Sequence, residues 1–297
     1  MDLGKLGVWT SMDGMSAAEA AAFARRVEAQ GYAALWLPES RGRNALVHSS
    51  WLLANTQRLV IAPGIANIYA RDPMAMAAAQ TGLNEQSGGR FLLGIGVSHA
   101  PAVEGMRGHS YGKPIATMRA YVEGMKQAAY AAPQPGEKPL LILAALGPHM
   151  LELSAELADG AHPYNTTPEH TQKARRILGA GKLLCPEQMV LLESDPERAR
   201  RVARRTLVRY MQLDNYVRAW RQQGFGDDLA GGGSDRFVDA IVAWGDERAI
   251  GARIRQHWDA GADHVCIQPL APEGSRPGAD ERVLKALAPA LDPRASA

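Results

Sequence analysis

Short apolar segments alternate with amphipathic segments along most of this chain, and this alternation limits the possible folds more than any other feature. The apolar segments have the length of buried strands, and the stretches between them have the periodicity of helices. Eight strands are predicted in chain order: Leu6 to Trp9, Ala33 to Leu37, Leu59 to Ile65, Phe91 to Ile95, Leu140 to Ala145, Gly160 to His162, Met189 to Leu192 and His264 to Gln268.

The segments between the strands begin with recognisable helix starts. Ser16 and Glu19 form a capping-box pattern, in which each side chain satisfies a free amide of the first turn. Asp72 precedes Pro73, so the aspartate can cap while proline takes the first helical position. The same arrangement recurs at Gly147-Pro148, Thr167-Pro168 and Asp195-Pro196. These starts predict helices between successive strands.

The predicted strands lack apolar/polar alternation, which is typical of parallel strands buried on both faces. Eight strand–helix units in 297 residues predict an α/β fold, a closed TIM (β/α)8 barrel, as one domain over residues 1–297. The stretch from about 195 to 243 is too long for one crossover and contains three successive glycines, Gly231 to Gly233. We expect a helical insertion there, between strands seven and eight, serving as a loop or lid near the barrel mouth.

Composition excludes several classes of partner. The formal net charge is only +2, which indicates neither nucleic acid nor an anionic membrane as partner. Cys185 and Cys266 lack the paired spacing of a zinc site or redox dithiol, and the histidines lack paired ligand spacing, so no metal site is expected. The N-terminal residues do not resemble a signal peptide. We therefore expect a cytoplasmic protein with a small-molecule substrate.

In a parallel barrel, the loops that follow the strands meet on one face, where functional residues gather. Several of these loops contain glycines that let the backbone approach a flat ligand, and Gly147 opens a helix whose free amides suit a phosphate. Glycines that merely terminate strands are the alternative. The loops in question are Trp9-Thr10, Glu39-Ser40, Gly64 to Asn67, Gly96 to His99, Ala145 to His149 and His162 to Asn165.

Four motifs in order carry a resemblance to a known family. They are Ala34-Leu35-Trp36-Leu37-Pro38-Glu39; Pro63-Gly64-Ile65-Ala66-Asn67 with Arg71-Asp72-Pro73; Ser87 to Gly96; and Ala145-Leu146-Gly147-Pro148 followed by Ala158-Asp159-Gly160. This pattern resembles the luciferase-like monooxygenase superfamily, in particular its branch that depends on the deazaflavin coenzyme F420. The resemblance runs from strand one to about strand six and returns near Gly261-Ala262-Asp263.

The resemblance implies a non-prolyl cis peptide between Gly64 and Ile65, forming a bulge behind the cofactor ring. It places Glu39 near the polar edge of the ring; pairing of Glu39 with an arginine, such as Arg41 or Arg43, is the structural alternative. It also implies a set of cofactor-binding positions: Glu39, Ser40, Gly64, Ile65, Asn67, Gly96, Val97, Ser98, Ala145, Leu146, Gly147, Pro148, His149 and Met150.

Two positions depart from the family's sugar dehydrogenases. Ser40 stands where those enzymes carry a histidine, and Val97 stands where they carry a glutamate. Sugar oxidation is therefore not carried over, and any proton must come from elsewhere. His99 is the candidate catalytic residue, together with Glu39, and Tyr111 is a possible acid. A histidine beside Pro101 with a purely structural role is the alternative.

Other motifs lead to weaker interpretations. Gly94 to His99 lacks the third glycine of a dinucleotide fingerprint, and Gly96 to Ala100 resembles a hydrolase nucleophile elbow without the helix that must start at the serine. Arginines 198, 200, 201, 204 and 205 form a basic helix start, which predicts either a solvated face or attraction of the coenzyme's acidic tail.

The function that these expectations favour is hydride transfer between a deazaflavin and a small organic substrate. An FMN-dependent monooxygenase or reductase on the same barrel is the first alternative. A flavin-binding protein without turnover is the second, because Ser40 and Val97 replace ionisable groups. The resemblance also implies a homodimer.

Overall fold

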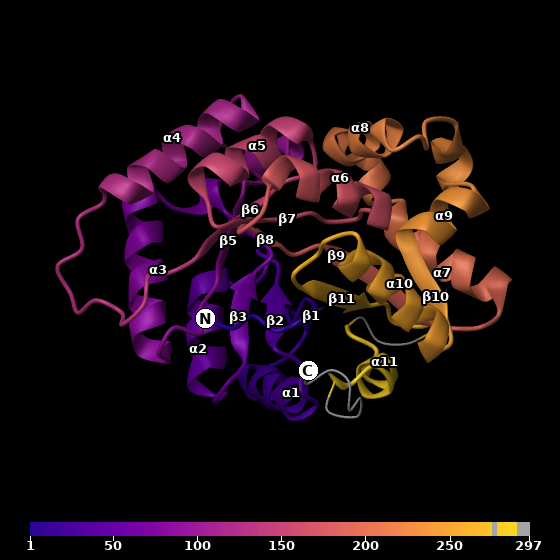
Figure 1. Cartoon of the computed structure of the whole chain (residues 1–297), viewed down its shortest axis with the longest axis horizontal. Helices are drawn as coiled ribbons and strands as arrows, with labels where there is room; N and C mark the ends of the chain where they lie inside the picture. The colour runs from indigo at the N-terminus through magenta and orange to yellow at the C-terminus, as the bar shows by residue number, and fades with distance from the viewer. Residues whose placement is uncertain (275–277, 290–297) are drawn as a thin grey trace.

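The computed structural model describes residues 1–274 and 278–289. Strands and helices alternate in the order shown in Figure 1. The strands are β1 (Leu6–Trp9), β2 (Ala34–Leu37), β3 (Val60–Pro63), β4 (Ala66–Asn67), β5 (Leu93–Gly96), β6 (Leu141–Ala144), β7 (Gly160–His162), β8 (Leu183–Leu184), β9 (Glu187–Leu192), β10 (Val242–Gly245) and β11 (Val265–Pro269). The α-helices are α1 (Ala17–Ala29), α2 (Ala45–Ala54), α3 (Pro73–Ser87), α4 (Pro114–Gln127), α5 (Pro148–Leu157), α6 (Pro168–Leu178), α7 (Pro196–Leu207), α8 (Asp214–Gln222), α9 (Asp235–Ile241), α10 (Glu247–Asp259) and α11 (Glu281–Ala286).

The strands pair in parallel in two sheets, ordered β10-β9-β11-β1-β2-β3 and β4-β5-β6-β7-β8. The chain itself joins the two sheets twice, because the edge strand β3 runs into β4, and β8 runs into β9, which lies next to the edge strand β10. A bridge between Ile61 and Phe91 and a hydrogen bond from Glu187 N to Pro163 O (2.9 Å) reinforce the two junctions. The parallel strands and alternating helices of a TIM-barrel α/β fold are therefore confirmed, while closure of the ring stays a prediction.

Most of the predicted helix starts are confirmed. Ser16 and Glu19 form a complete capping box, and Asp72, Thr167 and Asp195 each accept a first-turn amide in front of a proline. Gly147 differs, because α5 begins after it with no side-chain cap and no acidic side chain in its first turn. The first amides of α5 are thus left without the usual side-chain acceptor.

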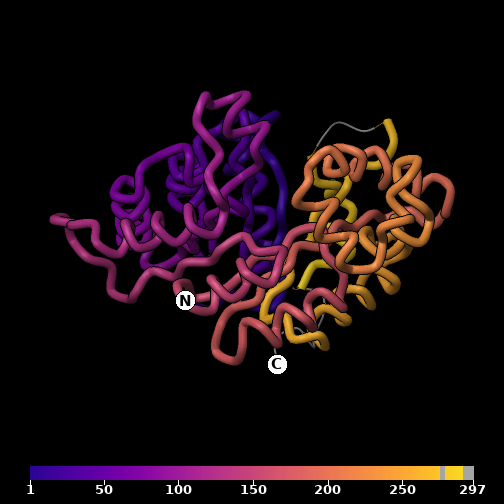
Figure 2. Tube along the Cα trace, turned by 90° about the horizontal axis from the view of Figure 1, so that it is seen from above, coloured from indigo at the N-terminus to yellow at the C-terminus, as the bar shows by residue number. Residues whose placement is uncertain are grey.

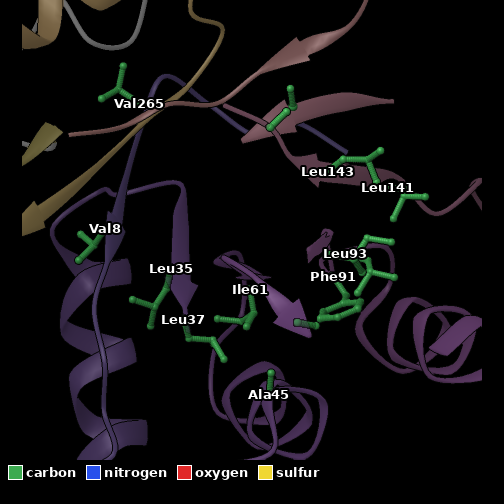
Figure 3. Close-up of a cluster of buried hydrophobic side chains, with 14 of the residues drawn as sticks. Val8, Leu35, Leu37, Ala45, Ile61, Phe91, Leu93, Leu141, Leu143 and Val265 are labelled. Carbon is green, nitrogen blue, oxygen red and sulfur yellow. The ribbon is translucent and has the colours of Figure 1, made fainter. Parts of the chain in front are cut away.

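Side chains on the two faces of the strands build two different cores. Leu35, Leu37 and Ile61 point outward toward the helices, where α2 supplies Ala45 (Figure 3). The opposite face fills the barrel interior with a second cluster that includes Trp9, Trp36 and both cysteines. Burial on both faces explains why the strands show no alternation in sequence.

Two strand predictions are corrected, and two strands, β8 and β10, were not predicted. The strand expected from Leu59 to Ile65 is split into β3 and β4 at Gly64 and Ile65. The strand expected to start at Met189 begins earlier, at Glu187, because the polar side chains of Glu187 and Gln188 are buried inside the protein. The strand β10 was not predicted, since Val242 to Gly245 is short and follows α9 directly.

Helices α7, α8 and α9 lie between β9 and β10 and gather at the right of the view in Figure 1. Seen from above, this part of the chain forms a distinct group beside the rest (Figure 2). Its own apolar cluster includes Leu207, Trp220 and Phe237 and packs on Met189 and Leu191 of β9. We call residues 196–241 the helical lobe.

Within residues 1–274 and 278–289, no helix combines the length and apolar character that a membrane span requires.

Candidate active site

A backbone bulge between β3 and β4 lies at the mouth of the barrel. The Gly64–Ile65 peptide bond is cis, as the sequence analysis predicted. Gly64 N donates to Leu37 O at 2.8 Å, and the Trp9 indole donates to Gly64 O at 2.9 Å. The bulge is thus fixed from the neighbouring strand β2 and, through the Trp9 side chain, from β1.

Gly96, at the end of β5, has a packing reason to lack a side chain. A Cβ there would lie 2.7 Å from Ile65 Cγ1 and 3.1 Å from Ala144 Cβ, which is too close. The glycine therefore accommodates the bulge itself, whereas the sequence analysis assigned such glycines to close approach of a ligand. A Cβ on Gly147 would meet nothing within 4 Å, so the space at the start of α5 is open.

The carboxylate of Glu39 organises this side of the mouth. Its side chain is 4% exposed, and it accepts hydrogen bonds from Asn67 N (2.9 Å) and Ala45 N (3.1 Å). Its ionic partner is Arg71, so the structural alternative of pairing with an arginine is confirmed, although the arginine is neither Arg41 nor Arg43. Glu39 holds α2, β4 and the start of α3 together, which is a positioning role; a part in proton transfer stays a prediction.

Asn67 stands between this network and β5. Its side-chain oxygen accepts the Tyr69 amide at 2.9 Å, and its backbone lies opposite Gly96 in the ladder. Ser40, which follows Glu39, is exposed. Of these two predicted positions, only Asn67 is built into the mouth.

The predicted phosphate site combines buried and open residues. Ala145 and Leu146 continue β6, and Gly147 and Pro148 start α5. The Met150 side chain is buried in the core, and the His149 ring is 80% exposed beside Glu152. These two residues belong to the uncapped first turn of α5 and can contribute their backbone amides to a phosphate site. Their side chains have no evident part in binding there.

Ser98 and His99 follow β5 at the mouth. Ser98 has a left-handed backbone (φ 58°), which is uncommon for a residue other than glycine and frequent at functional sites. Its carbonyl accepts the Tyr111 hydroxyl at 3.3 Å. His99 Nδ1 lies 2.9 Å from Asn215 Oδ1 on α8, and burial lowers the pKa of His99. The Tyr111 hydroxyl, the second expected proton-transfer candidate, is therefore bonded to the backbone of the residue that precedes His99.

The barrel interior beneath the mouth holds two neutral histidines. His162 stacks on Trp36, with ring centroids 4.6 Å apart, and hydrogen-bonds Cys185 O at 2.7 Å. His264 bonds the Trp36 indole at 3.1 Å and Gly4 O at 3.0 Å. Burial lowers the pKa of each to about 4, so both rings are uncharged at neutral pH. His162 Nε2 has no partner in the described structure.

The helical lobe contributes side chains to the mouth. The Tyr164 hydroxyl donates to Gln268 Oε1 at 2.6 Å and accepts from Tyr210 at 2.7 Å. The rings continue from Tyr164 through Tyr210 to Tyr216, with centroids 5.6 and 5.2 Å apart. The Trp220 indole donates to Asn165 O at 3.0 Å. Tyr164 and Asn165 lie in a loop predicted at the mouth without an assigned role, and Tyr210, Tyr216 and Trp220 were not predicted from the sequence.

Glu187 is a buried carboxyl group with no countercharge in contact. It is fully buried, and its Oε2 accepts Asn165 N at 3.1 Å, while its Oε1 has no partner among the described residues. Burial raises the pKa of Glu187 to about 8, so the group is predominantly protonated at pH 7. A glutamate at the start of an otherwise apolar strand was the available signal for this residue.

The arginines of α7 are paired with carboxylates. Glu193 partners Arg198, Asp235 and Asp239 partner Arg200, Asp235 partners Arg204, and Glu273 partners both Arg201 and Arg205. These pairs are largely exposed and favour a solvated, internally neutralised face over a site for an acidic tail.

Comparison with known proteins identifies the architecture. A family model described as luciferase-like monooxygenase matches residues 1–264. A putative coenzyme F420-dependent oxidoreductase from Mycobacterium tuberculosis is 31% identical over 199 residues, which cover 57% of this chain and 56% of that protein. The chain spans little more than half the length of the curated relatives it matches.

Solved structures share the fold at low identity. A coenzyme F420 dependent tetrahydromethanopterin reductase from Methanopyrus kandleri superposes with a TM-score of 0.72 at 16% identity, covering 97% of this chain and 98% of that one. A type II Baeyer–Villiger monooxygenase from Pseudomonas putida, in complex with FMN, superposes with a TM-score of 0.65 at 15% identity, covering 89% and 91%.

Proposed function

The chain belongs to the luciferase-like monooxygenase family, and from this premise we propose that it is an oxidoreductase that transfers a hydride between coenzyme F420 and a small organic substrate. The name of the relative from M. tuberculosis supports F420 over FMN as cofactor. The deazaflavin ring supplies the hydride when it is bound, and the protein supplies position and a dry environment.

The observation that carries this proposal is the open, uncapped start of α5. Its first amides have no side-chain acceptor, no carboxylate occupies the first turn, and space is free beside Gly147. A helix N-terminus of this kind attracts a phosphate through its amides and its dipole. Gly96 lies next to Ala144, so this turn adjoins the bulge at Gly64 and Ile65. The residues present therefore fit a phosphorylated cofactor whose ring lies toward the bulge.

The other mouth residues act by holding and enclosing. Glu39 fixes Asn67 and Arg71, and Trp9 fixes the bulge. The contact between His99 and Asn215 draws the helical lobe over the mouth, which excludes water. His99 is the group that we assign to proton delivery or orientation at the substrate, and Tyr111 is the next candidate. Sugar substrates are not proposed, because Ser40 and Val97 lack the ionisable groups.

An FMN-dependent monooxygenase or reductase is the second candidate, because FMN also carries a phosphate that would suit α5. The FMN complex of the Baeyer–Villiger monooxygenase supports this alternative on fold alone. A flavin-binding protein without turnover is the third. The homodimer and the single-domain boundaries stay predictions, with light scattering as the measurement for the dimer.

Turnover separates these candidates. Reduced F420, mixed anaerobically with the protein and a panel of neutral ketones, enones and imines, should be oxidised far faster than without protein. Oxygen-dependent product formation with reduced FMN, and none with F420, would favour the monooxygenase. Tight binding of either cofactor with no acceleration for any acceptor would favour the binding protein and contradict the proposal.

A further inference from the structure

Asn165, just after β7, has a backbone conformation that two neighbours enforce. Its φ of 57° is left-handed, and the residue is 2% exposed. Its N–H donates to Glu187 Oε2 at 3.1 Å, and its carbonyl accepts the Trp220 indole at 3.0 Å. Strand β9 and helix α8 therefore hold this one residue from opposite sides of its peptide backbone.

The side-chain amide of Asn165 has no partner. Both Nδ2 and Oδ1 are buried and make no hydrogen bond with the described residues. Thr166, the next residue, is 1% exposed, and its hydroxyl is likewise unpartnered. Buried polar groups are nearly always hydrogen-bonded, so three such atoms on successive residues point to a ligand that supplies the missing partners.

The surrounding groups indicate a neutral ligand. Glu187 Oε1 and His170 Nδ1 are also buried and have no hydrogen-bond partner in residues 1–274 and 278–289. Burial raises the pKa of Glu187 and lowers the pKa of His170, so both groups are predominantly neutral at pH 7. His170 donates through Nε2 to Leu146 O at 2.7 Å, which leaves Nδ1 as an acceptor. The cluster offers donors and acceptors together, which differs from the start of α5, where amide donors suit an anion.

We propose that Asn165 and Thr166 form a binding subsite for a neutral amide-type edge, in which a carbonyl and an N–H stand side by side. The Asn165 Nδ2 donates to the carbonyl of the ligand, and its Oδ1 accepts from the N–H of the ligand. The Thr166 hydroxyl either donates to that carbonyl or accepts from that N–H. This edge has two possible sources, the pyrimidine ring of a flavin-type cofactor or the substrate. The first source rests on the proposed function; the second does not.

The variant Asn165→Gly removes the side-chain amide and keeps the backbone conformation. Glycine adopts positive φ readily and keeps both backbone hydrogen bonds, to Glu187 and Trp220, while the amide disappears. An unpartnered buried group is removed as well, so the variant should melt at or above the temperature of the parent. Weaker binding without loss of stability is a result that a merely structural asparagine would not give.

Two titrations distinguish the sources, with uracil as a small neutral probe that carries the required edge. If the cofactor supplies the edge, the deazaflavin or FMN binds Asn165→Gly at least about tenfold more weakly than the parent, and uracil competes with it. If the substrate supplies it, cofactor binding is unchanged, and uracil binds the loaded parent but not the loaded variant. Equal cofactor and uracil binding by parent and variant overturns the inference. A parent that binds uracil through Asn165 but binds neither cofactor overturns the proposed function alone.

A pair of threonine variants provides the matched control. Thr166→Val removes an unpartnered hydroxyl, and we expect weaker ligand binding with undiminished stability. Thr56→Val removes a hydroxyl that is equally buried but donates to Leu52 O at 2.9 Å, so stability should fall while ligand binding stays unchanged. The same loss of binding in both variants, or in neither, contradicts the assignment of Thr166.

Discussion

The first strands of the barrel and the helical lobe contribute to the mouth in different ways. The earlier region offers backbone: the bulge at Gly64 and Ile65, and the amides of α5 behind Gly147. The lobe offers side chains, with Tyr210 bonded to Tyr164 and Trp220 bonded to Asn165. Backbone groups can hold parts that related cofactors share, such as a phosphate, whereas the side chains of a lobe can vary with the substrate. We therefore expect the first region to hold the cofactor and the lobe to select the substrate.

The largest expected effect is that of Gly147→Glu on cofactor binding. A carboxylate beside the uncapped amides of α5 would occupy the place of the phosphate and repel it, so binding should be lost. The fold should survive, because φ at Gly147 is −92° and the space around it is open. Titration with F420 and FMN measures the effect. Gly136→Glu adds the same charge at a similarly open loop position before β6 and is the control. Equal cofactor binding by the parent and Gly147→Glu would contradict the assignment of the phosphate site to the start of α5.

His99→Asn should lower the rate of the reductive step about 100-fold or more and leave cofactor affinity nearly intact. Burial lowers the pKa of His99, so a protonated His99 acting as acid gives a rate that falls as pH rises, with its midpoint below 6.5. Asn215→Asp would place a carboxylate beside His99 Nδ1, raise that pKa and move the midpoint to higher pH. Rapid mixing across pH measures both variants.

An unchanged pH dependence of the rate in His99→Asn would mean that His99 is not the proton donor. If His99→Asn reacts within a few-fold of the parent at every pH, the histidine is structural. The proton must then come from Tyr111, Glu39 or water, and the contact with Asn215 only anchors the lobe.

Sequence reasoning predicted the first region far better than the second. The capping box at Ser16 and the proline starts are local patterns, and hydrogen bonds within one turn decide them. The contact between His99 and Asn215 joins residues 116 positions apart, and no local pattern encodes it. The strand was predicted to start at Met189, whereas it begins at Glu187, which is buried and accepts the Asn165 amide. Pairing of Glu39 with an arginine was foreseen, but the choice of Arg71 over nearer arginines was not, because it depends on how the segment after β4 folds back onto Glu39.

Glu187→Gln should change how stability depends on pH. The pKa of Glu187 is about 8 in the folded protein against an ordinary value of 4.5, so the folded state keeps this proton where the unfolded chain has lost it. The free energy of unfolding of the parent should therefore fall as pH rises from about 4.5 to 8, by up to about 1.4 kcal/mol per pH unit from this group. Glu187→Gln lacks that decline.

Urea unfolding of parent and variant at several pH values between 5 and 9 gives the difference. Glu247→Gln, at an exposed position in the first turn of α10, is the control and should leave the slope as it is in the parent. If the free energy of unfolding depends on pH in the same way for the parent and Glu187→Gln, Glu187 is ionised in the folded protein. That result would contradict the proposal that the groups around Asn165 are neutral.

The smallest effect is expected from Arg205→Ala on α7. Arg205 pairs with Glu273 on the surface, at 53% and 45% side-chain exposure, and such pairs contribute about 1 kcal/mol or less. Stability should change little, and F420 affinity should stay the same at low and high salt. A clear, salt-dependent loss of F420 affinity would instead make the lobe a binding site for the acidic tail of the coenzyme.

The measurement that tests the central claim most directly is an absorbance titration of the purified protein with oxidised F420 and, separately, with FMN. We predict a saturable spectral change with F420 at one equivalent per chain, weaker or absent with FMN, and abolished in Gly147→Glu but not in Gly136→Glu. No spectral change with either cofactor, from a folded parent protein, would contradict the claim that this barrel mouth holds a deazaflavin or a flavin.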